Sequence, residues 1–162
     1  MGIGMPYSDL DSDTFNSRSG ETATRLGIYY RDVPIKTQVD AIVKSIEVDP
    51  KEPPNSLTIG NIKARVRMVA LYAFTNHLSA YSNKNNGKRV RVIGTGNLSE
   101  DFIGYDTKGG DALADIFPIG TLFKSEVYQM LDYFISKGVI TENDVDRVPS
   151  AGLWEGQTDE GE

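Results

Sequence analysis

Blocks of apolar and polar residues alternate along the chain in a way that predicts strands followed by helices. Residues 1–6 form a short apolar stretch that ends at Pro6, and residues 28–35 alternate apolar with polar side chains, so both predict strands. A helix is expected through residues 21–26, and residues 37–46 place apolar side chains at helical spacing. The first part of the chain therefore predicts strand, helix, strand, helix.

The remainder of the chain continues this alternation after a proline-rich loop at residues 49–55. The longest predicted helix spans residues 60–80, and the β-branched run at residues 89–94 predicts a strand. Residues 125–136 predict an amphipathic helix whose expected buried face consists of Val127, Met130, Leu131 and Phe134. Strands that alternate with helices predict an α/β fold with a parallel sheet and helices on both of its faces.

Composition places the chain among soluble globular proteins of one domain. It has 162 residues, of which 39% are hydrophobic and 25% charged. No apolar run approaches the roughly 20 residues of a membrane span, and we expect no secretory signal at the start. Cysteine is absent, which excludes disulfides, thiolate metal sites and a cysteine nucleophile and fits a reducing cytoplasm.

Charge argues against one class of partner and leaves another open. The net charge is −6, so the overall field does not favour binding to nucleic acid. Basic residues are denser from Lys63 to Arg91, where a local cationic pocket for a phosphorylated small molecule remains possible.

The segment Gly94–Glu100 follows a predicted strand and carries the first candidate chemistry. Ligands of open α/β sheets bind at the carboxyl ends of strands, and glycines there allow close approach to the backbone. Thr95 offers a hydroxyl, and Glu100 is a hard oxygen donor suited to Mg²⁺. The alternative is an ordinary strand-to-helix turn with an exposed glutamate, and composition alone favours this alternative.

Further candidates lie in a glycine-rich loop at residues 104–111 and just after it. Lys108 can reach an anion because the surrounding glycines leave room, and Asp115 can accept hydrogen bonds from sugar hydroxyls or an amide. Lys124 begins a predicted helix, where a cation is mildly unfavourable unless an anion binds it. The alternative for all three is a solvated surface charge.

The long predicted helix carries the last candidates. Asn61 and Arg65 are four residues apart and share a face, and an arginine there can clamp a carboxylate or phosphate. The alternative, a solvated basic face, is preferred on composition alone. His77 is the only histidine and receives no role, and no Ser-His-Asp or multi-histidine arrangement is indicated.

Five strings together resemble the NAD synthetase family, in its order and at its approximate separations. They are GNIKARVRM at 60–68, VIGTGN at 92–97, GYDTKGGD at 104–111, ADIFPIG at 114–120 and PSAGLWEGQTDE at 149–160. MPYSD and LGIYYRDVPI resemble the family's second and third strands. The resemblance covers essentially the whole chain, so it implies a single, partial ammonia-dependent synthetase domain over residues 1–162. The implied fold is the adenine nucleotide alpha hydrolase-like, Rossmann-like one, with its first strand missing here.

The resemblance also implies a reaction and roles for individual residues. In the family, ATP adenylates the nicotinate carboxylate of deamido-NAD with loss of pyrophosphate, and ammonia then displaces AMP to give NAD. Deamido-NAD would contact Asn61, Arg65, Lys108 and Asp115, ATP would contact Thr95, Lys124 and Ser150, and Mg²⁺ would be bound by Glu100. No protein nucleophile is implied. The family is commonly homodimeric through the long helix, and we expect a cytoplasmic protein with no nucleic-acid or membrane partner.

Two departures from the family pattern qualify this expectation. The Ser-Gly-Gly-x-Asp-Ser loop that wraps pyrophosphate and supplies another Mg²⁺ ligand is not matched, and neither is a C-terminal His-Lys pair near deamido-NAD. The missing first strand would leave unpaired backbone groups near Ile3 and Val92. We favour a fragment that is inactive alone.

Two other interpretations stay open beside the fragment. One is a truncated, non-catalytic nucleotide-binding or partner-interaction module of the same fold. The other changes the acceptor, as in GMP or asparagine synthetases, and the strings at 104–111 and 149–160 argue against it. The sequence does not decide whether the nitrogen comes from ammonia directly or from a glutaminase domain.

Overall fold

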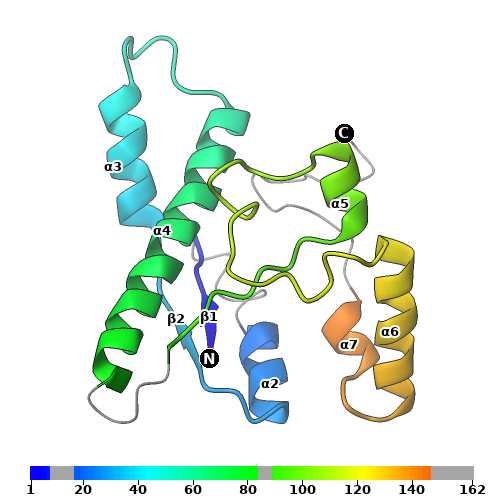
Figure 1. Ribbon diagram of the computed structural model, residues 1–162. Coiled ribbons are helices and arrows are strands. Elements are labelled where there is room, and N and C mark those ends of the chain that lie inside the picture. The colour runs from blue at the N-terminus through cyan, green and yellow to red at the C-terminus, as the bar shows by residue number, and fades with distance from the viewer. Residues whose placement is uncertain (8–16, 84–88, 147–162) are drawn as a thin grey trace. The chain divides into compact units, whose positions relative to one another are not determined.

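The computed structural model describes residues 1–7, 17–83 and 89–146, and within them six helices accompany two short strands (Figure 1). No helix in these ranges combines the length and apolar character needed to cross a membrane. In chain order the elements are β1 (Gly2–Gly4), α2 (Ser17–Arg25), β2 (Tyr30–Asp32), α3 (Lys36–Ile46), α4 (Ser56–Asn83), α5 (Leu98–Ile103), α6 (Lys124–Ser136) and α7 (Glu142–Val145).

Strands β1 and β2 pair in parallel, with Ile3 opposite Arg31. Helix α2 lies between them in the sequence, so the three elements form a β-α-β arrangement. The pairing continues past the strand ends, since Val33 N–H donates to the Gly4 carbonyl at 2.8 Å and Ile35 N–H to the Pro6 carbonyl at 2.9 Å. The predicted parallel α/β arrangement is confirmed.

Tyr30 packs its ring against two glycines, one on β1 and one on α2. A Cβ at Gly2 would lie 3.0 Å from Tyr30 Cδ2, and one at Gly20 would lie 3.6 Å from Tyr30 Cδ1. The Tyr30 hydroxyl donates to Asp32 Oδ1 at 3.0 Å. Burial, the hydrogen bond to Asp32 and the charge of Asp32 raise the pKa of Tyr30 to about 12. The absence of side chains at both glycines therefore lets one aromatic ring join the strand pair to the helix.

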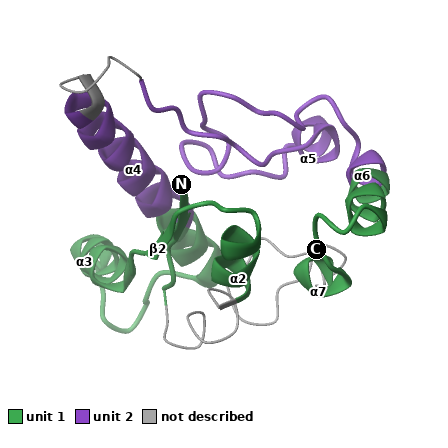
Figure 2. Cartoon of the chain, turned by 90° about the horizontal axis from the view of Figure 1, so that it is seen from below, with its two compact units in different colours: residues 1–63, 128–162 green, residues 64–127 purple. Residues whose placement is uncertain are grey.

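The chain divides into two compact units, which Figure 2 distinguishes by colour. The first unit comprises residues 1–63 and 128–162, and its most buried side chains are Ile35 and Val39 at the start of α3. The second unit comprises residues 64–127, and its buried apolar side chains are Ala64, Val66, Met68 and Val92. The single domain expected over residues 1–162 stays a prediction.

Within the first unit, α7 is fastened to α2 through Asp144. Its carboxylate accepts hydrogen bonds from the Thr22 hydroxyl and from Arg25 on α2. Asp144 also completes the capping box of α7, because its carboxylate accepts from the Thr141 N–H at 2.7 Å. Only 7% of the Asp144 side chain is exposed. The Thr22 hydrogen bond, the Thr141 hydrogen bonds and the Arg25 charge hold the pKa of Asp144 far below its ordinary range.

The prediction of a strand at residues 89–94 is wrong, because this segment forms only a single parallel bridge, from Ile93 to Ile116. Its backbone groups bond elsewhere: Val90 N–H donates to Ser79 Oγ at 3.0 Å and Val92 N–H to Asp115 Oδ2 at 2.7 Å. These bonds account for Val90 and Val92 themselves, and the expectation of unpaired backbone groups near Ile3 and Val92 stays a prediction. Side-chain oxygens accept the hydrogen bonds of these two donors.

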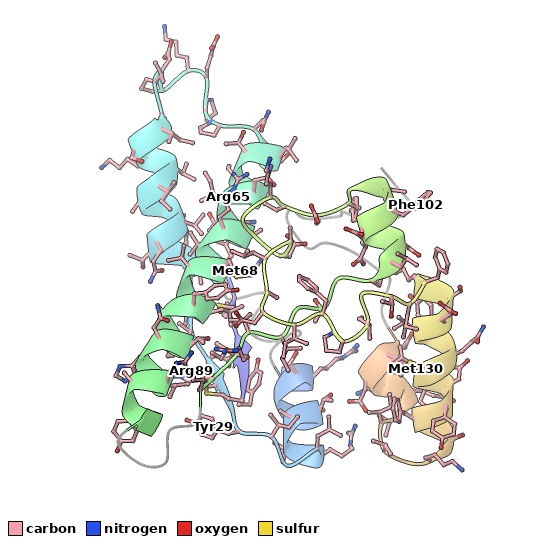
Figure 3. The ribbon with its side chains drawn as sticks, in the orientation of Figure 1. Tyr29, Arg65, Met68, Arg89, Phe102 and Met130 are labelled. Carbon is pink, nitrogen blue, oxygen red and sulfur yellow. The ribbon has the colours of Figure 1, made fainter. Side chains whose placement is uncertain are left out.

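The predicted helix at residues 125–136 is confirmed as α6, but its expected buried face is wrong. No residue of α6 is buried, and Met130, labelled in Figure 3, is 42% exposed while Phe134 is 37% exposed. Val127 and Leu131 are half-buried. Apolar periodicity identifies the face of a helix that favours contact, but it does not determine whether another element covers that face.

Candidate functional site

Arg65 and Lys108 form the most direct link between two predicted site residues. Arg65 lies on α4, where Figure 3 labels it. Its Nε donates to the backbone carbonyl of Lys108 at 3.1 Å, although the residues are 43 apart in sequence. Both side chains are exposed. Within the described ranges, neither the Lys108 ammonium nor the two terminal nitrogens of Arg65 meet a protein acceptor. The hydrogen bond thus brings the Lys108 backbone to Arg65, and the charged donors of both side chains remain available to a carboxylate or phosphate.

The turn that carries Lys108 is closed by one side-chain and one backbone hydrogen bond. Thr107 N–H donates to Asp111 Oδ1 at 2.9 Å, and Gly110 N–H donates to the Thr107 carbonyl at 2.7 Å. Thr107 is buried, whereas Lys108 is exposed. An aspartate that accepts from a backbone N–H four residues earlier favours a tight turn. The lysine is therefore presented on a fixed backbone rather than on an unstructured loop.

Phe117 covers the glycines on either side of Thr95. A Cβ at Gly94 would lie 2.4 Å from Phe117 Cε1, and one at Gly96 would lie 3.5 Å from the same ring. Thr95 itself is exposed, and its hydroxyl has no protein partner in the described part of the chain. The aromatic ring therefore fixes this turn from one side while the Thr95 hydroxyl faces solvent.

Asp115 holds the same turn through the backbone. Its Oδ2 accepts from Val92 N–H at 2.7 Å, and its own N–H donates to the Val92 carbonyl at 3.0 Å. Gly94 N–H continues the pattern by donating to the Ile116 carbonyl at 2.8 Å. Asp115 is exposed, so a structural hydrogen bond by one carboxylate oxygen leaves the other oxygen facing solvent.

Helix α5 begins with a capping box formed by Asn97 and Glu100. The Asn97 side chain accepts from Glu100 N–H at 3.1 Å, and Glu100 Oε2 accepts from Asn97 N–H at 3.2 Å. Gly104 ends the helix in the left-handed conformation at φ 69°. The Asn-x-x-Glu spacing is a recognisable helix-start signal, and it was the signal that sequence reasoning overlooked when it treated Glu100 only as a ligand or an exposed residue.

Lys124 lies beside the start of α5. Its backbone N–H donates to Ser99 Oγ at 3.0 Å, and Leu98 N–H donates to the Leu122 carbonyl at 2.8 Å. These bonds join the beginning of α6 to the beginning of α5 within the second unit. The predicted phosphate-binding lysine and the predicted metal-binding Glu100 therefore belong to neighbouring helix starts.

Six of the eight residues predicted for the site fall within the second unit, and two do not. Asn61 lies on α4 in the first unit and already has an interaction partner, and Ser150 lies outside the described residues. The six are Arg65, Thr95, Glu100, Lys108, Asp115 and Lys124. Sequence reasoning missed the residues that hold them, notably Ser99 and Phe117, because an interaction between distant segments leaves no local pattern.

A divalent metal has a partial fit to these residues. In the described ranges no three His, Cys, Asp or Glu side chains gather closely enough to bind a metal by themselves. Glu100 nevertheless uses only Oε2 in its cap, and among the described residues Oε1 has no donor. Mg²⁺ is commonly bound by one or two carboxylates together with substrate phosphates, so Glu100 fits one position in such a shell.

Comparison with known proteins places this geometry in a family. The family model described as NAD synthase matches residues 1–162. The chain belongs to the NAD synthase family. It is 39% identical over 160 residues to the NH(3)-dependent NAD(+) synthetase of Methanosarcina mazei, covering 99% of this chain and 56% of that protein.

Solved structures of NAD synthase relatives agree in fold. The NMN synthetase of Francisella tularensis superposes with a TM-score of 0.74 at 33% identity, over 98% of this chain and 59% of that one. The NH3-dependent NAD synthetase of Campylobacter jejuni, solved with nitrate, gives a TM-score of 0.66 at 31% identity, over 88% and 58% of the two chains. The predicted Rossmann-like α/β fold class is therefore confirmed, and the chain spans little more than half the length of these relatives.

Proposed function

We propose that this chain supplies substrate-binding residues for the ATP-dependent amidation of deamido-NAD by ammonia. The products are NAD, AMP and pyrophosphate. The observation that supports the proposal is the hydrogen bond between Arg65 Nε and the Lys108 backbone carbonyl, since the Lys108 ammonium and the terminal nitrogens of Arg65 have no protein acceptor among the described residues. The names of the relatives from Methanosarcina mazei and Campylobacter jejuni support the same chemistry.

The reaction first joins two anionic substrates, and the proposed roles follow from that need. A nicotinate carboxylate oxygen attacks the α-phosphorus of ATP and pyrophosphate leaves; ammonia then attacks the acyl carbon and AMP leaves. Arg65 and Lys108, with Asn61 and Asp115, bind deamido-NAD, and fixed cations lower the cost of bringing its charges to ATP. Asp115 contributes the carboxylate oxygen that Val92 does not use.

The ATP end of the proposed site uses the two neighbouring helix starts. Thr95 offers its exposed hydroxyl, Lys124 binds phosphate, and Ser150 contributes from outside the described residues. Glu100 offers Oε1 to Mg²⁺, which when bound neutralises phosphate charge. We also propose a cytoplasmic homodimer, which the absence of cysteine and the exposed Leu57 and Val69 on α4 support.

We propose that these 162 residues alone do not catalyse the reaction, because they contain no Ser-Gly-Gly-x-Asp-Ser segment to wrap the pyrophosphate. The second candidate is a non-catalytic module that retains nucleotide binding. Another candidate substrate is nicotinate mononucleotide, which the name of the Francisella tularensis relative favours.

The test combines calorimetric binding with turnover. Deamido-NAD, nicotinate mononucleotide and ATP are titrated into the purified chain, and NAD formation is followed with ATP, Mg²⁺ and ammonium. We expect deamido-NAD to bind without turnover, and R65A and K108A each to weaken binding by about tenfold or more, since a hydrogen bond to a charged group contributes ~1.5–3 kcal/mol. K137A is the matched control and should bind normally, because Lys137 follows the end of α6 and its ammonium lies over the Tyr133 ring.

Each outcome separates the candidates. Tighter binding of the mononucleotide would replace deamido-NAD as the substrate, and binding of ATP alone would favour the non-catalytic module. Turnover by the 162 residues would refute the proposed inactivity, and equal loss in K137A and K108A would mean that only net charge matters.

A further inference from the structure

Two adjacent glycines in the Lys108 turn need to be glycine for different reasons. Gly109 has φ +73°, a conformation that disfavours any side chain, and a Cβ there would meet no atom within 4 Å. Gly110 lies outside that left-handed region, but its Cβ would lie 2.9 Å from Ala64 Cβ and 3.0 Å from Thr107 Cγ2. Gly109 therefore satisfies a backbone requirement, whereas Gly110 satisfies a requirement for space.

The space at Gly110 lies beside the hydrogen bond between Arg65 and the Lys108 backbone. Ala64 is buried on α4 and immediately precedes Arg65, which donates to the Lys108 carbonyl. Gly110 is tied to the same turn because its N–H donates to the Thr107 carbonyl at 2.7 Å. The close contact between Gly110 and Ala64 thus lets the turn pack against α4, near enough for Arg65 to bond to the Lys108 carbonyl.

Gly110 and Ala64 are so close that one added methyl group at residue 110 would push the turn away from α4. Carbon atoms pack best at about 3.5–4.0 Å, so a Cβ placed 2.9 Å from Ala64 would push the turn away by roughly 0.6–1 Å. The distance between Arg65 Nε and the Lys108 oxygen, 3.1 Å, would then reach about 3.7–4 Å, which is beyond hydrogen-bonding range.

We propose that Ala64, Thr107 and Gly110 are positioning residues that seat the Lys108 turn on α4 and so hold Arg65 and Lys108 as one anion-binding pair. The identity of the anion, a carboxylate or phosphate of deamido-NAD, rests on the proposed function. The seating itself does not, because it concerns only the contact between the turn and the helix. Both cations face solvent, so without this seat each would have to be ordered separately when the ligand binds.

The experiment compares G110A with G109A in the full chain, using two readouts. The first is hydrogen exchange of the Arg65 Nε–H, measured by NMR, and the second is calorimetric affinity for deamido-NAD. We expect G110A to abolish protection of the Nε–H and to weaken binding by about tenfold or more. G109A should strain the turn and lower its stability, yet retain the Nε–H protection and an affinity within about threefold of the parent chain.

A rescue variant distinguishes positioning from general damage. The double variant G110A/A64G removes the nearest contact, so it should regain Nε–H protection and part of the affinity relative to G110A, with A64G measured as its reference. Unchanged protection in G110A, or no recovery in the double variant, would overturn the inference. If protection follows the variants as expected but the parent chain binds no deamido-NAD, the positioning stands and the proposed substrate is wrong.

Discussion

Replacing Gly94 by alanine is the perturbation for which the structure gives the sharpest expectation. The new Cβ would lie 2.4 Å from Phe117 Cε1, 2.6 Å from Cδ1 and 2.8 Å from Ala114 Cβ. The backbone at Gly94 is not in the left-handed region, so alanine is conformationally permitted there. The cost of the substitution therefore comes from contact alone.

The expected cost follows from how far the neighbours must move. Contacts of 2.4–2.8 Å are about 1 Å shorter than comfortable carbon–carbon packing, and they come from two sides, a ring and a methyl group. Phe117 is partly exposed and can swing outward, but Gly94 N–H is bonded to the Ile116 carbonyl, next to Phe117. Overpacking of this kind costs ~1–3 kcal/mol, and we expect the upper half of that range because moving Phe117 also disturbs this hydrogen bond.

Gly96 provides the matched control, because it lies under the same ring. Its Cβ would be 3.5 Å from Phe117, an ordinary van der Waals contact, and its backbone is also permitted for alanine. Urea unfolding followed by far-UV circular dichroism should therefore show G96A within ~0.5 kcal/mol of the parent chain. F117A, which itself removes packing, should lower the additional cost of G94A in a double-mutant cycle.

Two results would refute the reasoning about Gly94. Equal destabilisation by G94A and G96A would mean that any side chain in this turn is unfavourable, and that contact with the Phe117 ring does not cause the cost of G94A. An additive F117A/G94A double variant would mean that the two residues do not interact in solution.

Two further predictions concern carboxylates. D115A should destabilise the chain by ~1.5 kcal/mol through loss of the Val92 N–H bond, while D115N, whose amide oxygen can accept that bond, should lose less than half as much in urea unfolding; equal losses would contradict this. The pKa of Asp144 is lowered in the folded state, so its contribution is present above its ordinary value of 3.8 and declines as pH falls below it. Thermal unfolding should therefore show the parent chain's advantage over D144N shrinking from about pH 6 to about pH 3, and a pH-independent difference would exclude the linkage.

The sequence predicted best those elements whose stability is local. Helix α3 was expected at residues 37–46 and spans Lys36–Ile46; its apolar side chains recur at helical spacing, and Val39 among them is fully buried in the first unit. The predicted helix at residues 60–80 likewise forms, within the longer α4. In both cases the spacing of apolar side chains along one segment is sufficient information.

The elements that failed were those that apolar periodicity does not determine. The segment around Val92 has the composition of a strand, but Val90 and Val92 donate to the Ser79 and Asp115 side chains, and its backbone pairing is a single bridge from Ile93 to Ile116. Helix α5 has only six residues, too few for apolar periodicity to be visible, and it is defined by its caps at Asn97 and Gly104. Neither outcome is encoded in the spacing of apolar residues.

The predicted site residues also explain how the second unit is held together. Three side chains in or beside the predicted site bond to the backbone of a distant segment. Arg65 bonds to Lys108, 43 residues away, and Asp115 bonds to Val92, 23 residues away. Ser99, next to Glu100, bonds to Lys124, 25 residues away. In the described part of this unit the only regular elements are helices, so side chain–backbone bonds do the work that a strand ladder does elsewhere. Alanine substitution of Arg65 or Asp115 would therefore remove a proposed ligand contact and a structural hydrogen bond together. Changes that keep the structural bond, such as D115N, are needed to measure the binding contribution by itself.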